Sequence, residues 1–295
     1  MEKILITGAS GFAGSNVVKH LLNKGYEICV VVRKSSNIHL IEEFSNQINI
    51  FVYDNNLGNL IKFFKKFKPK TVCHLASLFI AEHNSSQVND LIDSNIKFGS
   101  HILEAMKEAN VYNLVNTGTS WQHFNNNNLY NPVCLYAATK QAFESIIDFY
   151  VDTYNFKVIT LKLYDTYGEN DVRPKLINLL NKFADEKTLL NMSPGNQELC
   201  LIHISDVCDA FEISINLLNE KKIGHKKYFL YTNEIFTLKK VIDLFEKISN
   251  KKININWGGR SYRKREVMKV FKDGINLPGW NPKISLAKGL KLYIK

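Results

Sequence analysis

The sequence has no long apolar run. None of its segments approaches the roughly 18 consecutive apolar residues of a transmembrane helix. The first residues, MEKILITG, enter a short apolar stretch without the cationic region or the small-residue cleavage site of a secretory signal. We therefore expect neither a membrane partner nor export from the cell.

Cysteines are few and scattered. Their number, five, is odd, and no pair is in the C-x-x-C spacing of a zinc or redox site. The pattern excludes a disulfide framework, gives no metal site, and favours a reduced, cytoplasmic compartment. These cysteines are Cys29, Cys73, Cys134, Cys200 and Cys208.

Positive charge is concentrated in the last quarter of the chain. The net charge of +10 divides into −4 for residues 1–220 and +14 for residues 221–295. A basic segment of this kind can meet nucleic acid, an anionic membrane or a small anionic ligand, or consist of solvated lysines. We favour solvated lysines, with a few cations on an anionic ligand and no nucleic acid as partner.

Short β-branched runs alternate with helical stretches over the first half of the 295 residues. This alternation predicts βαβ units and a parallel sheet covered on both faces, which is an α/β, doubly wound Rossmann fold. Strands are expected at 3–7, 27–32, 49–53, 71–75, 112–116 and 157–163, and helices at 12–24, 57–68, 88–109 and 136–154.

The alternation loosens after about residue 164, where proline and glycine separate shorter elements. We expect a dinucleotide-binding Rossmann domain over residues 1–165. Residues 166–295 then form a smaller α/β lobe that binds the substrate, with residues 201–220 packing back on the Rossmann sheet.

A glycine-rich turn follows the first strand. Gly8, Gly11 and Gly14 have the spacing G-x-x-G-x-x-G and open a helix. Glycine allows the tight turn and the close approach of backbone to a pyrophosphate, whose charge lies on the free N–H groups of the helix N-terminus. The spacing at this point of the fold predicts a dinucleotide site.

The end of the second strand indicates which dinucleotide binds. An acidic side chain there would accept from a ribose 2′-hydroxyl. Arg33, Lys34 and Ser35 stand there instead, and their chemistry suits a 2′-phosphate. We therefore expect NADPH (NADP) as the cofactor.

Tyr136 and Lys140 lie four residues apart, which on a helix is one face. The pair opens the helix after the fifth strand, and that strand is expected to end at Asn116 and Thr117. The side chains of Tyr136, Lys140 and Thr117 can then meet at the carboxyl edge of the sheet, where ligands bind in open α/β folds.

These motifs resemble the extended short-chain dehydrogenase/reductase family, the NAD-dependent epimerase/dehydratase group. The resemblance extends to Asp54, His74-Leu75-Ala76, Asn95, Tyr167-Gly168 and the segment 202–207. The stretches 116–117, 135–144 and 164–180 are most similar to the reductases that complete CDP-linked 3,6-dideoxyhexoses. The resemblance implies a homodimer and an NADPH-dependent reduction of a 4-keto sugar in the biosynthesis of surface polysaccharides.

The resemblance also implies a role for each catalytic residue. Tyr136 would protonate the carbonyl oxygen, with its pKa lowered by the charge of Lys140. Lys140 would also bind the nicotinamide ribose, and Thr117 would hydrogen-bond the substrate oxygen, with Thr119 or Ser120 as the alternative. The implied cofactor contacts are Gly8, Ser10, Gly11, Phe12, Ala13, Arg33, Lys34, Ser35, Asp54, Asn55, Leu75, Ala76, Ser77, Asn95, Tyr136, Lys140 and Leu163. Asp54 would accept from the adenine amino group or, equally, cap a turn.

A nucleotide diphosphate needs cations in the second lobe. Arg263, in an Arg-x-x-Glu-Val-Met segment, is the first choice and Arg260 the second. The expected substrate contacts are Thr119, Ser120, Trp121, Tyr164, Arg173, Lys175, Arg260 and Arg263.

A dehydratase does not fit this sequence. Dehydratases of the family carry Asp-Glu after the catalytic threonine, whereas Gly118-Thr119 follow here, so dehydration lacks its acid and base.

Three alternatives to a reductase stay open. The alternatives are an epimerase with tightly bound NAD, a dinucleotide-sensing protein without catalysis, and a nucleic-acid-binding protein.

Overall fold

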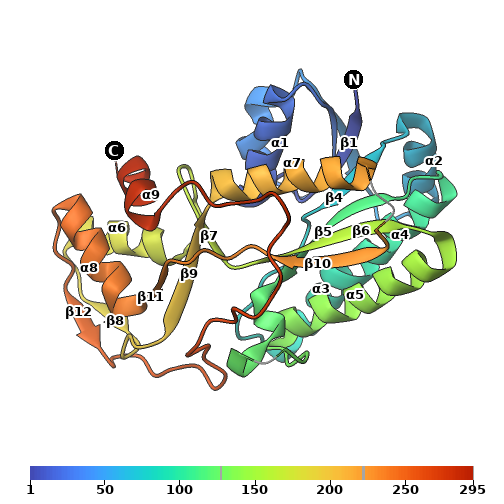
Figure 1. Cartoon of the computed structure of the whole chain (residues 1–295). Helices are drawn as coiled ribbons and strands as arrows, with labels where there is room; N and C mark the ends of the chain where they lie inside the picture. Colours follow the sequence, from blue (N-terminus) through green and yellow to red (C-terminus); the bar gives the residue numbers. More distant parts are fainter. Residues whose placement is uncertain (127, 221–222, 295) are drawn as a thin grey trace.

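A computed structural model describes residues 1–126, 128–220 and 223–294. Its centre is a seven-stranded sheet with the order β10-β6-β5-β4-β1-β2-β3, in which every neighbouring pair is parallel (Figure 1). The strands are β1 (Lys3–Thr7), β2 (Glu27–Arg33), β3 (Ile48–Tyr53), β4 (Thr71–His74), β5 (Asn113–Thr119), β6 (Lys157–Leu163) and β10 (His225–Phe229). This topology confirms the predicted doubly wound Rossmann fold.

Helices cover both faces of this sheet. Helices α1 (Phe12–Asn23) and α7 (Ile204–Glu220) pack side by side on one face. Helices α2 (Leu57–Phe67), α4 (Phe98–Glu108) and α5 (Leu135–Tyr154) cover the other face (Figure 1). Successive side chains of a strand point to opposite faces, so Ile4 and Ile6 of β1 enter the core under α1 and α7 while Leu5 enters the other.

The stretch 88–109 is not one regular helix. It consists of α3 (Val88–Ile92), a π-helical turn (Asp93–Lys97) and α4. Such turns occur where an extra residue is accommodated, often beside functional sites. Here the turn contains Asn95, whose side chain is 1% exposed.

The chain returns to the main sheet after residue 203. Helix α7 packs against α1, and β10 adds the edge strand next to β6. The strand before α7, β9 (Glu198–His203), pairs outside the main sheet with β7 (Asp165–Tyr167) and β11 (Ile235–Thr237). The edge of the Rossmann sheet is therefore formed by β10, which comes after β7 and β9 of the second lobe in the sequence.

The second lobe has its own small core (Figure 1, left). Helix α8 contributes its buried face, Val241, Ile242 and Phe245, to this core. The lobe contains the β7-β9-β11 sheet, the pair β8 (Leu190–Met192) and β12 (Ile255–Trp257), and helices α6 (Leu176–Glu186), α8 (Leu238–Ser249) and α9 (Leu286–Tyr293).

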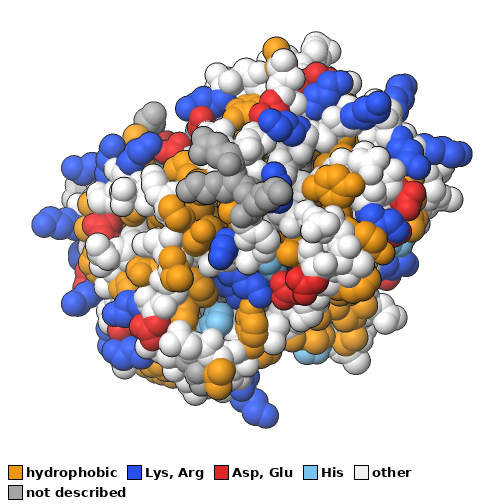
Figure 2. Space-filling view, turned by 45° about the vertical axis from the view of Figure 1, so that its right-hand side comes forward, with side chains coloured by type: hydrophobic (Ala, Val, Ile, Leu, Met, Phe, Trp, Pro, Cys, Tyr) orange, Lys and Arg blue, Asp and Glu red, His pale blue; other side chains and the backbone are white. Residues whose placement is uncertain are grey.

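Among the described residues, no helix has the length and apolar character needed to cross a membrane. Figure 2 shows Lys and Arg side chains spread widely over one face of the molecule rather than gathered in a single patch. On this face the basic surplus does not form the continuous stripe that nucleic-acid backbones favour.

Candidate active site

The turn between β1 and α1 is shaped to receive a pyrophosphate. Gly8 has φ of +74°, and a Cβ atom there would lie 2.6 Å from the backbone nitrogen of Ala76. A Cβ on Gly14 would lie 2.1 Å from the carbonyl oxygen of Gly8. The N-cap of α1, Gly11, provides no side-chain hydrogen bond, so this helix end is open to an anionic ligand. These features fit the diphosphate of a dinucleotide.

The expected adenosine end of the site lies at the carboxyl ends of β2 and β3. Arg33, Lys34 and Ser35 are all exposed there. Asp54 is exposed too, and its carboxylate accepts from the backbone N–H of Asn56 at 3.0 Å and from Nδ2 of Asn59 at 2.7 Å. These hydrogen bonds lower the pKa of Asp54. Asp54 therefore closes the turn that leads into α2, whose N-cap is Asn56, and its contact with an adenine amino group stays a prediction.

Tyr136 and Lys140 lie on consecutive turns of α5, near its N-terminus. Lys140 is only 1% exposed, and its Nζ donates to Oγ1 of Thr117 at 3.4 Å. The Thr117 hydroxyl in turn donates to the carbonyl oxygen of His74 at 3.1 Å. Thr117 is thus engaged within the protein, between β4 and α5.

A different threonine accompanies the tyrosine. The hydroxyls of Thr119 and Ser77 act on the phenol of Tyr136 and lower its pKa, and all three side chains line the same cavity. Strand β5 extends through Thr119, beyond the end expected at Asn116 and Thr117, and this extension brings Thr119 to the same cavity wall as Tyr136. The contacts favour Thr119, the alternative in the sequence analysis, over Thr117 as the partner of the substrate oxygen.

The pKa of Tyr136 is raised, not lowered as expected. Burial raises the pKa of Tyr136 to about 12, although the neighbouring hydroxyls of Ser77 and Thr119 act to lower it. Lys140 does not produce the expected lowering because desolvation of the phenol dominates. Burial also lowers the pKa of Lys140 itself to about 8, against the attraction of Glu144.

Asn95 is fully used inside the protein. Its Oδ1 accepts from the Leu78 N–H at 2.7 Å and from the Ser77 hydroxyl at 3.2 Å. Its Nδ2 donates to the Leu78 carbonyl at 3.0 Å and to the Thr139 hydroxyl at 2.9 Å. Asn95 therefore anchors the loop after β4 to α5 and leaves its amide no free position for a cofactor.

A cavity of about 760 Å³ opens in front of Tyr136 and is lined by both lobes. This volume suits a sizeable small-molecule ligand. All eight expected substrate residues and several of the expected cofactor residues line it. The former are Thr119, Ser120, Trp121, Tyr164, Arg173, Lys175, Arg260 and Arg263, and the latter include Ala13, Leu75, Ser77, Tyr136 and Leu163. Thr117 also lines the cavity, whereas the remaining cofactor candidates and Lys140 do not.

Aromatic rings surround the phenol of Tyr136. Phe79 packs edge to face on Tyr136, with ring centroids 5.0 Å apart. The ring centroids of Phe79 and Trp121 are 5.5 Å apart. Sequence reasoning missed Phe79, because nothing in a loop sequence shows which apolar side chain will face a cavity. Tyr164 is a structural member of the wall, since its hydroxyl donates to the Phe271 carbonyl at 2.5 Å.

The four expected cations differ in their freedom to bind an anion. Arg173 donates through Nε and Nη2 to the Asp171 carboxylate, each at 2.8 Å, and Arg263 pairs with Glu266. The ammonium of Lys175 lies 4.0 Å from the ring centroid of Phe79 and the side chain of Arg260 is exposed. Among the described residues, neither Lys175 nor Arg260 has a salt bridge.

The comparisons with known proteins agree with this architecture. A family model described as "NAD dependent epimerase/dehydratase family" matches residues 4–227. The chain is 27% identical to a CDP-abequose synthase of Yersinia pseudotuberculosis over 90% of each chain. It is 26% identical to a putative UDP-glucose 4-epimerase of Methanocaldococcus jannaschii, over 99% of this chain and 97% of the other.

Solved structures show the same fold. A UDP-glucose 4-epimerase from Stenotrophomonas maltophila, crystallised with NAD and formylated UDP-arabinopyranose, superposes with a TM-score of 0.88 at 16% identity. The match covers 100% of this chain and 97% of that one.

Proposed function

Because the chain belongs to the NAD-dependent epimerase/dehydratase family, we propose that it is an NADPH-dependent reductase of a nucleotide-linked sugar. The group reduced is the 4-keto group of a 6-deoxy or 3,6-dideoxyhexose, carried on CDP. The observation that carries the proposal is the pairing of Tyr136 with the Thr119 hydroxyl at the wall of a cavity that both lobes line.

Tyr136 is suited to give a proton to a carbonyl oxygen. With a pKa of about 12 its phenol is protonated at neutral pH, and it lies beside two further hydroxyls, those of Thr119 and Ser77. When bound, the dinucleotide supplies the hydride. The Thr119 hydroxyl donates a hydrogen bond to the oxygen on which negative charge develops, and Tyr136 then protonates that oxygen.

The choice of NADPH follows from the end of β2. Arg33 and Lys34 are exposed cations, and Ser35 adds a hydroxyl. A 2′-phosphate suits this group through charge-assisted hydrogen bonds, whereas a ribose 2′-hydroxyl finds no carboxylate there to accept its hydrogen bond.

Reduction also agrees with what the site lacks. Neither Thr117 nor Thr119 is followed by the Asp-Glu pair of the family's dehydratases. The similarity to CDP-abequose synthase supports CDP as the carrier. The proposal includes a cytoplasmic homodimer that acts in surface-polysaccharide sugar synthesis, as the family resemblance implies.

The test is stoichiometric oxidation of NADPH on CDP-4-keto-deoxyhexoses, followed at 340 nm. Tyr136→Phe is expected to lower kcat by orders of magnitude. The matched pair Thr119→Val and Thr117→Val separates the two threonines, because only Thr119→Val removes the hydroxyl beside Tyr136. Retained activity in Tyr136→Phe contradicts the assigned chemistry.

Two other results would replace the proposal. Copurified NAD with interconversion of sugar epimers and no net cofactor consumption would make the protein an epimerase, the activity of several of its structural neighbours. Tight NADP(H) binding with no turnover of any nucleotide sugar would make it a sensor.

A further inference from the structure

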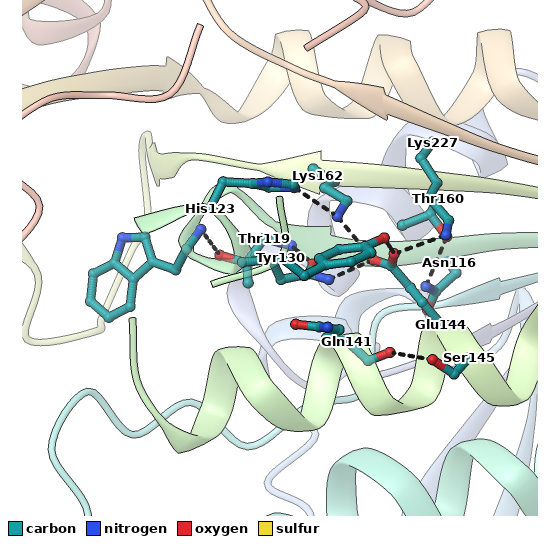
Figure 3. A network of polar contacts seen from close by, with 12 residues as sticks. Asn116, Thr119, His123, Tyr130, Gln141, Glu144, Ser145, Thr160, Lys162 and Lys227 are labelled. Carbon is teal, nitrogen blue, oxygen red and sulfur yellow. Dashed lines mark hydrogen bonds and ion pairs between the residues drawn. The ribbon is translucent and has the colours of Figure 1, made fainter. Parts of the chain in front are cut away.

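A buried polar network includes Thr119 and the side chains around Glu144 (Figure 3). Its centre is Glu144 of α5, one helical turn beyond Lys140, with a side chain 2% exposed. The carboxylate accepts from Nε2 of Gln122 at 2.9 Å and from the Tyr130 hydroxyl at 2.6 Å. The Nζ atoms of Lys162 of β6 and Lys227 of β10 lie 3.4 and 3.6 Å from its Oε1 and Oε2 atoms.

Stability alone does not account for this network. Removing a carboxylate and an ammonium from water costs about as much as their attraction returns, and apolar replacements of buried ion pairs are often neutral or stabilising. Burial lowers the pKa of Lys162 to about 8, which shows that desolvation outweighs its attraction to Glu144. A role in fixing the geometry of neighbouring groups is the alternative to a role in stability.

The network leads to Thr119 through one side chain. Gln122 is completely buried, and its Oε1 accepts from the Thr119 backbone N–H at 3.1 Å while its Nε2 donates to Glu144. The Thr119 hydroxyl also accepts from the Trp121 N–H at 3.2 Å, which closes the 3-10 turn Ser120–Gln122. The end of β5 is therefore held from both its backbone and its side chain.

We infer that Glu144 and Gln122 are positioning residues that keep the Thr119 hydroxyl beside Tyr136. Glu144 orients the Gln122 amide, and Gln122 fixes the backbone of Thr119. The inference rests on the proposed function, because it takes Thr119 as the hydroxyl that meets the substrate oxygen. Glu144 and Gln122 themselves touch neither substrate nor cofactor in this arrangement.

The decisive variant is Gln122→Met, which breaks the bridge and leaves every charge in place. A displacement of about 1 Å in a reacting group can cost on the order of 100-fold in rate. We expect kcat to fall about 10- to 100-fold, while KM for the sugar nucleotide and Kd for NADPH change by less than about threefold. A loss of kcat at constant KM is not what general loosening of the fold would give.

Two further variants sharpen the test. Glu144→Gln keeps a carbonyl oxygen for the Gln122 amide and is expected to retain kcat within about threefold, with a lowered Tm because Lys162 loses its partner. Thr160→Val is the matched control: Thr160 belongs to the same buried region and bonds Asn116 and His225, but not Thr119. It is expected to lower Tm without changing kcat.

A folded Gln122→Met enzyme with wild-type kcat overturns the inference, as does a Glu144→Gln enzyme that loses more rate than Gln122→Met. If Gln122→Met does not fold, the exchange Gln122→Glu with Glu144→Gln keeps both hydrogen bonds and the net charge. Its kcat is then expected within about threefold of wild type, and a loss beyond tenfold overturns the inference.

Failure of the proposed function has a separate signature, which is absence of turnover in the wild-type protein. Crystal structures of wild type and Gln122→Met then decide the positioning role without an assay. A Thr119 hydroxyl that has moved away from Tyr136 in the variant supports the role, and an unmoved one overturns it.

Discussion

Replacing Lys140 with methionine is expected to stabilise the fold at neutral pH. Lys140 is 1% exposed, and its pKa falls from the ordinary 10.5 to about 8 because burial disfavours the ammonium. At about 1.4 kcal/mol per pKa unit, keeping the charge buried costs about 3 kcal/mol at pH 7. Methionine has a similar length and carries no charge, so the variant avoids this cost.

The cost depends on pH with a definite sign. The folded-state pKa lies below the unfolded one, so the unfolded chain binds more protons between about pH 8 and 10.5, and wild-type stability rises with pH in that window. The full cost is present below about pH 8 and vanishes above about pH 10.5. The advantage of Lys140→Met should therefore shrink from about 3 kcal/mol at pH 7 to about 1.4 kcal/mol at pH 9.5.

Urea denaturation at these two pH values measures the advantage, with the exposed Lys240→Met as the control that should change neither value. A variant less stable than wild type at pH 7 would show that Glu144 compensates the Lys140 charge completely. An advantage equal at both pH values would refute the assignment of the cost to a buried ammonium.

Three other changes test the cofactor and substrate sites. Gly14→Ala would bring a Cβ within 2.1 Å of the Gly8 carbonyl oxygen, so dinucleotide affinity should fall at least tenfold and the free energy of unfolding by about 1–3 kcal/mol. Fluorescence titration and denaturation measure the two effects, and unchanged values would contradict the prediction. Arg33→Ala should weaken NADPH about tenfold and leave NADH unchanged, since a charge-assisted pair contributes about 1.5–3 kcal/mol; an equal loss for both would remove the 2′-phosphate role. Raising ionic strength from about 0.05 to 0.3 M should lower kcat/KM for the nucleotide sugar severalfold, because the last 75 residues carry a net charge of +14 that steers an anion. A kcat/KM that does not change with ionic strength would leave those lysines without a kinetic role.

The local sequence was sufficient to predict the parallel sheet and the helices that cover it. Short β-branched runs such as 27–33 are too short for helices and too apolar for loops, so their alternation with helices specified a parallel sheet. The glycines of the first turn and the four-residue spacing of Tyr136 and Lys140 depend only on backbone geometry within one element. The edge strand β10 was not predicted, because HKKYF shows neither a buried run nor clean alternation.

The finer assignments needed contacts between distant residues. Thr117 and Thr119 are two positions apart on one strand, and only the folding of His74 and Lys140 against the first and of Tyr136 against the second separates them. The high pKa of Tyr136 follows from burial, which no local pattern gives.

The residues that hold Thr119 show the same division. Gln122 and Glu144 are 22 residues apart and come from a loop and a helix. The sequence by itself determined the fold, the dinucleotide loop and the tyrosine–lysine pair, because these arise from spacing within single elements. The tertiary structure decided which hydroxyl accompanies the tyrosine and which charges are buried behind it, because desolvation and hydrogen-bond partners exist only after the elements have packed together.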